Sequence, residues 1–213
     1  MTDITRPPEL IYVGDPLCSW CWGFAPSLRT LRLRHPDRFR YRILLGGLRT
    51  GASALRVDDK VRAYLAGAWK EVERRSGQPF NHSFLETADF VYDTEPACRA
   101  VVAVRHLAPD RVFEYNEALQ EAFYHRSLDP TKLETFLTIA REQGRLQEEA
   151  FRTTFRAEEI RRETREDFDE ARALGVHGFP TLLVRTNDGS TQTITSGWLP
   201  PEALADQLAP WLN

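Results

Sequence analysis

The feature that most constrains the fold of this chain is a pair of cysteines, Cys18 and Cys21, placed between an apolar segment and an amphipathic one. Residues 10–14 form a short apolar, partly β-branched run that ends in glycine, which is typical of a buried strand. Residues 24–34 carry apolar side chains at approximately helical spacing, and the pattern stops at a histidine followed by proline, where a helix is expected to end. The sequence therefore predicts that both cysteines lie in the first turn of a helix that directly follows a strand.

A helix N-terminus is a chemically distinctive place for a cysteine. Its free N–H groups and the positive end of the macrodipole stabilise a thiolate, so we expect a lowered pKa for Cys18 and assign it the role of nucleophile. Cys21 follows one turn later, where it can attack a mixed disulfide at Cys18 and release the bound thiol. A structural or inert pair and half of a zinc site stay open as alternatives. No second CxxC or HxxxH motif occurs in the sequence, so we expect no metal.

Composition limits the classes of partner. The 213 residues include 28 lysines and arginines against 31 acidic residues, a formal charge of -3, which gives no electrostatic case for binding nucleic acid or anionic lipid. No apolar run approaches the roughly twenty residues of a membrane-spanning helix, and residues 1–8 lack the features of a signal peptide. We expect a cytoplasmic protein without a membrane partner. In that compartment a CxxC pair is more typical of redox or metal chemistry than of a structural disulfide.

The order of the remaining segments predicts an α/β architecture. A second strand should lie parallel to the first because a helix connects them, and a long block of helical patterns follows. Strand character then returns, with a hairpin turn at residues 187–190 and a last amphipathic helix beginning at Pro201. The three further strands are expected at residues 39–45, 178–185 and 191–195. We divide the chain into a discontinuous domain of residues 1–56 and 166–213 and an all-helical insertion of residues 57–165.

This order, with Cys18-Ser19-Trp20-Cys21 after the first strand and Gly178-Phe179-Pro180-Thr181 opening the third, resembles the thioredoxin fold. The long helical insertion makes the chain similar to the DsbA family in particular. The sequence of residues 14–26 and 93–100 resembles that of a branch of cytosolic DsbA-like proteins. These proteins are described as predicted protein-disulfide isomerases and are related to the FrnE group. The resemblance implies a thiol-disulfide oxidoreductase or isomerase that acts through a redox-active Cys18–Cys21 disulfide.

The resemblance also implies roles for individual residues. Cys18 would be the exposed nucleophile and Cys21 the buried resolving thiol. Pro180 would follow a cis peptide bond, and the backbone of Phe179 would receive an extended substrate segment as a short added strand. Further site residues are expected from the same motifs, with apolar surface from Trp20 and Trp22 and support from Ser19 and Thr181. The Ser-Trp dipeptide between the cysteines lacks the histidine of strongly oxidising family members, so we expect a less oxidising couple.

Partners of such an enzyme would be cysteine-containing polypeptides or low-molecular-weight thiols, with glutathione as a candidate co-substrate and no other cofactor. Kappa-class glutathione transferases and 2-hydroxychromene-2-carboxylate isomerases resemble the same architecture but carry serine where Cys18 stands, and they form the alternative hypothesis. A binding module that prevents aggregation, with vestigial cysteines, is a third. Cys98 is expected to be a buried small residue, with a third redox thiol as its alternative, and His177 is expected in a solvent-facing loop. The sequence leaves the oligomeric state open.

Overall fold

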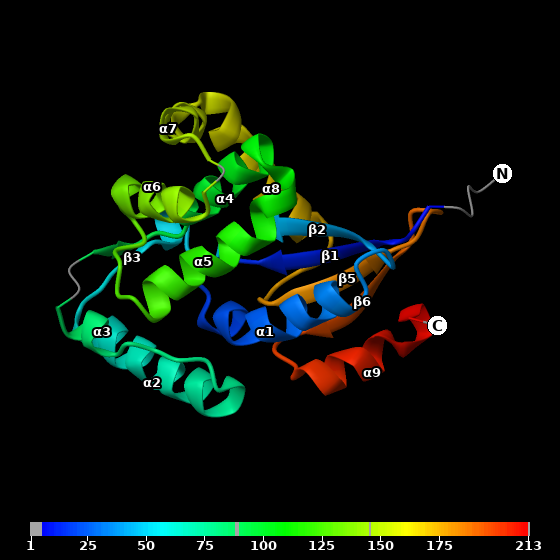
Figure 1. Cartoon of the computed structure of the whole chain (residues 1–213). Coiled ribbons are helices and arrows are strands. Elements are labelled where there is room, and N and C mark those ends of the chain that lie inside the picture. The colour runs from blue at the N-terminus through cyan, green and yellow to red at the C-terminus, as the bar shows by residue number, and fades with distance from the viewer. Residues whose placement is uncertain (1–5, 88–89, 145, 213) are drawn as a thin grey trace.

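The computed structural model describes residues 6–87, 90–144 and 146–212. Its centre is a four-stranded sheet with the order β2-β1-β5-β6 (Figure 1). The strands are β1 (Glu9–Gly14), β2 (Arg40–Leu45), β5 (Thr181–Arg185) and β6 (Thr191–Ser196). β1 runs parallel to β2 and antiparallel to β5, and β5 pairs antiparallel with β6 across the hairpin. The sheet is thus mixed, and its two central strands are buried.

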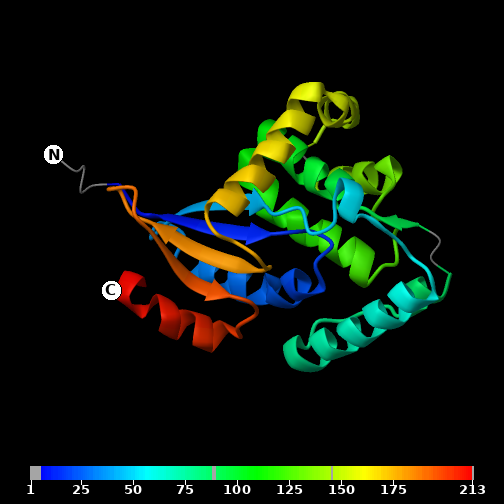
Figure 2. The ribbon, with the colours of Figure 1, turned by 180° about the vertical axis from the view of Figure 1, so that it is seen from behind.

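Helices cover both faces of this sheet (Figures 1 and 2). The alternation of side chains along β1 sends Leu10 and Tyr12 into the main apolar core with α1 (Ser19–Arg34) and α9 (Pro201–Leu212). Ile11 and Val13 point to the opposite face, into a smaller cluster with Ala171 of α8 (Glu158–Ala173). The first strand is therefore buried on both sides, which explains its uninterrupted apolar run.

The insertion lies at the end of the sheet where β1 stops (Figure 1). Its core is aromatic: Trp69 packs edge to face on Tyr124 with ring centroids 5.2 Å apart, and Phe123 packs on the same tryptophan at 5.5 Å. Its helices are α2 (Asp59–Ser76), α3 (Ser83–Thr87), α4 (Glu95–Leu107), α5 (Val112–Tyr124), α6 (Leu133–Glu142) and α7 (Glu148–Arg156). Short 3-10 turns lie at Gly51–Ser53 and Pro109–Arg111. α1 packs against α2 and α5, so the helix that carries the cysteines joins the two parts of the molecule.

Most of the predicted architecture is confirmed, namely the α/β class, the four strands and the long helical insertion. One expectation is wrong, because the insertion is not entirely helical. β4 (Val91–Tyr92) pairs antiparallel with β3 (Leu55–Arg56), and strands of two residues are too short to show an alternating pattern. The third strand starts at Thr181, since residues 178–180 form the preceding bend. The proposed domain boundary at residues 165 and 166 lies inside α8, and the division remains a prediction.

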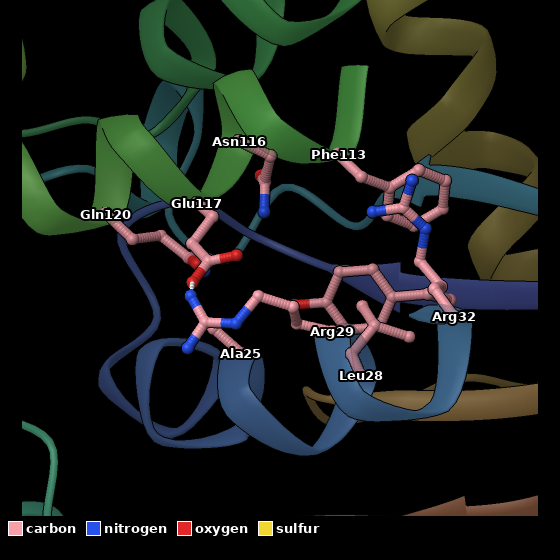
Figure 3. A pocket seen from close by; sticks show the side chains of 9 residues that line it. Ala25, Leu28, Arg29, Arg32, Phe113, Asn116, Glu117 and Gln120 are labelled. Carbon is pink, nitrogen blue, oxygen red and sulfur yellow. Dashed lines mark hydrogen bonds and ion pairs between the residues drawn. The ribbon is translucent and has the colours of Figure 1, made fainter. Parts of the chain in front are cut away.

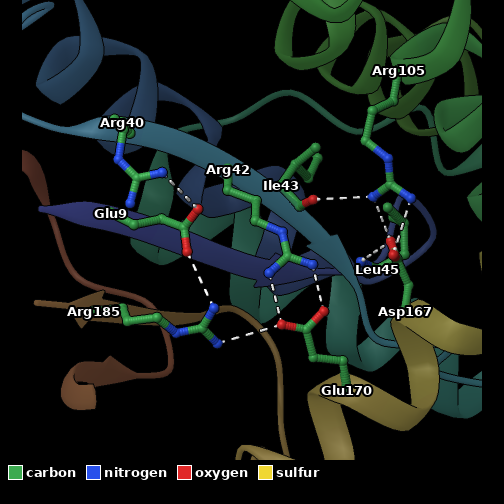
Figure 4. Close-up of polar contacts among 9 residues, drawn as sticks. All are labelled: Glu9, Arg40, Arg42, Ile43, Leu45, Arg105, Asp167, Glu170 and Arg185. Atoms are coloured by element: carbon green, nitrogen blue, oxygen red, sulfur yellow. Dashed lines mark hydrogen bonds and ion pairs between the residues drawn. The ribbon is translucent and has the colours of Figure 1, made fainter. Parts of the chain in front are cut away.

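Ion pairs hold α8 against the sheet (Figure 4). Asp167 accepts two hydrogen bonds from Arg105 of α4, at 2.7 and 3.0 Å, and a third from the backbone N–H of Leu45 at 3.1 Å. One turn further, Glu170 pairs with Arg42 of β2. α8 is rich in charge, as the sequence shows, yet several of its charges face the sheet and α4 rather than solvent. None of the helices in the described part of the chain combines the length and the apolar character needed to cross a membrane.

Candidate active site

The two cysteines lie at the junction that the sequence predicted. Cys18 is the residue that precedes α1, and its carbonyl oxygen accepts hydrogen bonds from the N–H groups of Cys21 at 2.9 Å and Trp22 at 3.1 Å. Both cysteines are free thiols in the structure. Cys21 is fully buried, and burial raises the pKa of its thiol well above the ordinary range. The pair is therefore built with one sulfur in the interior and the other nearer the surface.

Cys18 is less exposed than the resemblance implied. Only 7% of it is accessible to solvent, because the loop around Phe179 and the insertion close over it. The hydroxyl of Tyr92 reaches from β4 to the carbonyl oxygen of Leu17, the residue before Cys18. The expected exposed nucleophile is thus corrected to a nearly buried one.

Residues 179 and 180 return from far along the chain to face this sulfur. The Phe179–Pro180 peptide bond is cis, and the Cys18 thiol donates to the carbonyl oxygen of Phe179 at 3.6 Å. Thr181 is buried beside them, and its hydroxyl donates to the Gly178 carbonyl at 2.8 Å. A Cβ on Gly46 would lie 2.0 Å from the ring of Phe179, so glycine is required there for the ring to occupy this position. The structure brings together the two motifs that the sequence singled out.

The two tryptophans of the motif have different surroundings. Trp20 is half-buried beside the half-buried Ser19 and faces Trp198, with ring centroids 6.3 Å apart, and the guanidinium of Arg75 lies over both rings. Trp22, expected to offer apolar surface near the thiols, is instead buried. Its indole N–H donates to the Pro79 carbonyl at 3.1 Å, so this side chain packs against the insertion.

Asp15 is a site residue that the sequence did not single out. It is only 1% exposed, and its carboxylate accepts hydrogen bonds from the N–H groups of Leu17 at 2.8 Å and Leu48 at 2.7 Å. The hydroxyl of Thr94 donates to it at 2.7 Å and the thiol of Cys98 at 3.4 Å. Burial raises the pKa of Asp15 despite these donors. The carboxylate joins the turn before Cys18 to α4, and only the folded chain reveals this contact.

Tyr12 is a second residue that sequence reasoning missed. Its hydroxyl lies near the Cys21 sulfur, and burial together with that neighbouring sulfur raises the pKa of the phenol well above its usual range. A tyrosine in an apolar strand gives no sequence signal of such a contact.

Cys98 and His177 are the other residues for which the sequence made an expectation. Cys98 is fully buried, as expected, although its thiol has a polar partner in Asp15. His177 is exposed, as expected for a loop residue. Within residues 6–87, 90–144 and 146–212, no group of three or more histidine, cysteine and acidic side chains is arranged to hold a metal ion.

Solved structures with the same architecture include two informative relatives. A candidate protein disulfide isomerase from Nitrosomonas europaea is 36% identical, with a TM-score of 0.87 over 97% of this chain and 98% of the other. The cytosolic disulfide reductase DsbM from Pseudomonas aeruginosa is 25% identical, with a TM-score of 0.75 over 95% of this chain and 94% of its own. DsbM has also been solved with GSH.

Curated relatives include the ClpXP adapter protein SpxH from Bacillus licheniformis, which is 25% identical over 181 residues. The alignment covers 83% of this chain but only 57% of that protein, so the chain spans little more than half of its length. The model of the DSBA-like thioredoxin domain matches residues 9–209. The expected thioredoxin fold of the DsbA type is therefore confirmed, and the chain belongs to the family of DSBA-like thioredoxin domains.

Proposed function

We propose that this protein is a thiol-disulfide oxidoreductase that uses Cys18 and Cys21 as its redox couple. The Cys18 thiolate attacks a substrate disulfide, forms a mixed disulfide and releases one substrate thiolate. The Cys21 thiolate then attacks the Cys18 sulfur, which closes the Cys18–Cys21 disulfide and releases the second thiolate. The observation that carries the proposal is the 3.6 Å contact between the Cys18 sulfur and the Phe179 carbonyl, with Cys21 one helical turn away.

Two substrate classes fit this site. The backbone of Phe179 can pair with an extended polypeptide that carries the disulfide, which requires no particular side chain in the substrate. A small thiol can reach the same sulfur, and glutathione is our candidate co-substrate because the related DsbM has been solved with GSH. The cytosolic description of DsbM supports a cytoplasmic location for this chain as well.

We further propose that the couple works as a reductase or isomerase. Stabilising the thiolates of a CxxC pair stabilises its reduced form. A CxxC protein with a stabilised reduced form is a stronger oxidant. Here the resolving sulfur is fully buried, which disfavours its thiolate and raises the pKa of Cys21. The Ser-Trp dipeptide adds no cation between the cysteines. Both features favour a less oxidising couple.

Insulin reduction driven by dithiothreitol tests the proposal. Wild-type protein should accelerate the precipitation of insulin, Cys18→Ser should match buffer alone, and Cys98→Ser should keep the wild-type rate because Cys98 lies apart from the exchange. Equal activity of wild type and Cys18→Ser would refute the proposal. Glutathione-dependent transferase or isomerase turnover that survives in Cys18→Ser would instead favour the kappa-class alternative.

A further inference from the structure

Tyr12 is positioned on β1 so that its side chain reaches the buried cysteine. The ring stacks on Phe24 of α1, with centroids 6.2 Å apart, and leans along the strand over Gly14, two residues further on the same face. A Cβ on Gly14 would lie 2.5 Å from the phenol oxygen. Glycine at this position therefore makes room for the hydroxyl, which lies close enough to the Cys21 sulfur for the two groups to interact electrostatically.

A second polar group approaches the same hydroxyl from α5. The amide of Gln120 is 1% exposed and lies beside the phenol of Tyr12, and neither of its polar atoms has a protein hydrogen-bond partner of regular geometry among the described residues. Buried polar groups are costly unless they are hydrogen-bonded, so the burial of this amide beside the phenol calls for a reason. The phenol is the member of the pair that lies near Cys21.

A small cavity of about 20 Å³ connects these groups to the surface (Figure 3). Tyr12 and Gln120 line it together with Arg29 and Glu117, which form an exposed ion pair. Figure 3 shows Asn116, Glu117 and Gln120 projecting from α5 toward α1. A space of this size holds about one water molecule when polar groups line it. The phenol thus borders a small polar space that Cys18 does not line.

We propose that Tyr12 is a further catalytic residue, whose phenol donates a hydrogen bond to the Cys21 sulfur as that sulfur becomes a thiolate and attacks the mixed disulfide at Cys18. The inference rests on the proposed thiol-disulfide exchange. The Cys21 proton leaves to solvent, a sulfur-sulfur bond forms between Cys21 and Cys18, and the bond between Cys18 and the substrate breaks with release of the substrate thiolate. Tyr12 keeps its own proton throughout, because its pKa lies well above the usual range.

The titratable groups around Cys21 come from each element packed against it. Cys18 lies in the same turn as Cys21, Tyr12 lies on β1 and Tyr124 on α5, and the backbone of Asp15 is also near the sulfur. Tyr124 is itself buried, and burial raises its pKa well above the ordinary range, so it stays neutral as Cys21 ionises. Among the neighbouring side chains, Tyr12 is then a neutral group placed to donate to the sulfur.

Single-turnover reaction of the reduced protein with an equimolar aromatic disulfide, dithiobis(nitrobenzoate), separates the two steps. The first coloured thiolate appears when Cys18 attacks the reagent, and the second appears when Cys21 closes the protein disulfide. Tyr12→Phe should slow the second phase by on the order of tenfold or more, the usual effect of a hydrogen bond to a charged group, and leave the first phase unchanged. The pH profile of the second phase should move upward by about one unit.

Two further variants make the test specific. Gly14→Ala should displace the phenol and slow the same phase. Tyr115→Phe removes another fully buried hydroxyl, which donates to the Phe136 carbonyl at 3.1 Å inside the insertion, and it should alter neither phase. An unchanged second phase in Tyr12→Phe at every pH, or equal slowing of both phases, would overturn the role of Tyr12. Failure of the proposed function itself would look different, because wild type would then show no phase that Cys18→Ser lacks.

Discussion

Asp167 offers a sharp test of how the fold supports the site. Its side chain is 6% exposed. Its carboxylate accepts hydrogen bonds from both terminal guanidinium nitrogens of Arg105 and from the backbone N–H of Leu45 (Figure 4). Leu45 is the last residue of β2, and the next residue, Gly46, donates to the Gly14 carbonyl at 2.8 Å beside the cysteine turn. Asp167→Ala should therefore loosen the end of β2 as well as the contact between α8 and α4.

The magnitude follows from what the substitution leaves behind. Removing one partner of a buried ion pair costs about 3–5 kcal/mol, and the 26% exposure of the Arg105 side chain places this case near the lower end. The N–H of Leu45 loses its acceptor, which costs about 1–3 kcal/mol if nothing replaces it. We expect Asp167→Ala to lower the free energy of unfolding by about 4–6 kcal/mol in total.

Urea unfolding followed by circular dichroism measures this change, and the chain provides a matched control. Glu142 likewise accepts two hydrogen bonds from the guanidinium of Arg126, at 2.7 and 2.8 Å. Here, however, the Glu142 side chain is 45% exposed and that of Arg126 is 37% exposed. Glu142→Ala should cost less than about 1 kcal/mol, as exposed pairs do. With a slope of about 2 kcal/mol per molar urea, the midpoint should move by about 2–3 M for Asp167→Ala and by less than about 0.5 M for the control. Similar shifts for the two variants would refute the argument from burial.

Further outcomes are expected at the site. Gly46→Ala should lower the insulin-reduction rate roughly tenfold to hundredfold by displacing the ring of Phe179, whereas Gly67→Ala, with open space around its Cβ, should leave the rate unchanged; equal rates would contradict this. Burial raises the pKa of Asp15 above its ordinary value of 3.8, so the folded chain binds this proton more tightly than the unfolded chain. The free energy of unfolding should then fall as the pH rises from about 4 through the raised pKa, and Asp15→Asn should flatten that fall in urea titrations; parallel curves would speak against it. Iodoacetamide followed by mass spectrometry should modify the buried Cys98 only after unfolding, and labelling of the native protein would disprove its inaccessibility.

The parts of the fold that the sequence predicts well are those with a local physical cause. The apolar run of β1 is buried on both faces, and the observed strand differs from the predicted one by a single residue, Glu9. The cysteine pair lies at the strand-to-helix junction because the apolar run stops and helical spacing begins there. Phe179 and Pro180 were assigned to the site through the resemblance, and the structure places them beside Cys18.

The parts that escaped prediction depend on contacts between distant segments. Asp15 follows a strand and precedes a proline, which suggests a turn residue, and only the approach of Thr94 and Cys98 from α4 shows that its carboxylate is buried. The burial of Trp22 has a similar origin. An apolar residue on a helix must be covered, but its spacing does not tell which element covers it, and here the insertion does so through Pro79.

Under the proposed function, the burial of Cys18 restricts what the site can accept. A thiolate attacks a disulfide along the sulfur-sulfur axis, so the substrate sulfur must come into contact with a nucleophile that is only 7% exposed. We expect a sulfur enclosed by the Phe179 loop and the insertion to exclude a disulfide on a rigid, folded surface and to admit a small disulfide or an extended segment of an unfolded polypeptide. Under the proposed function the insertion would then limit access to Cys18, and the indole of Trp22 ties the cysteine helix to this insertion at Pro79.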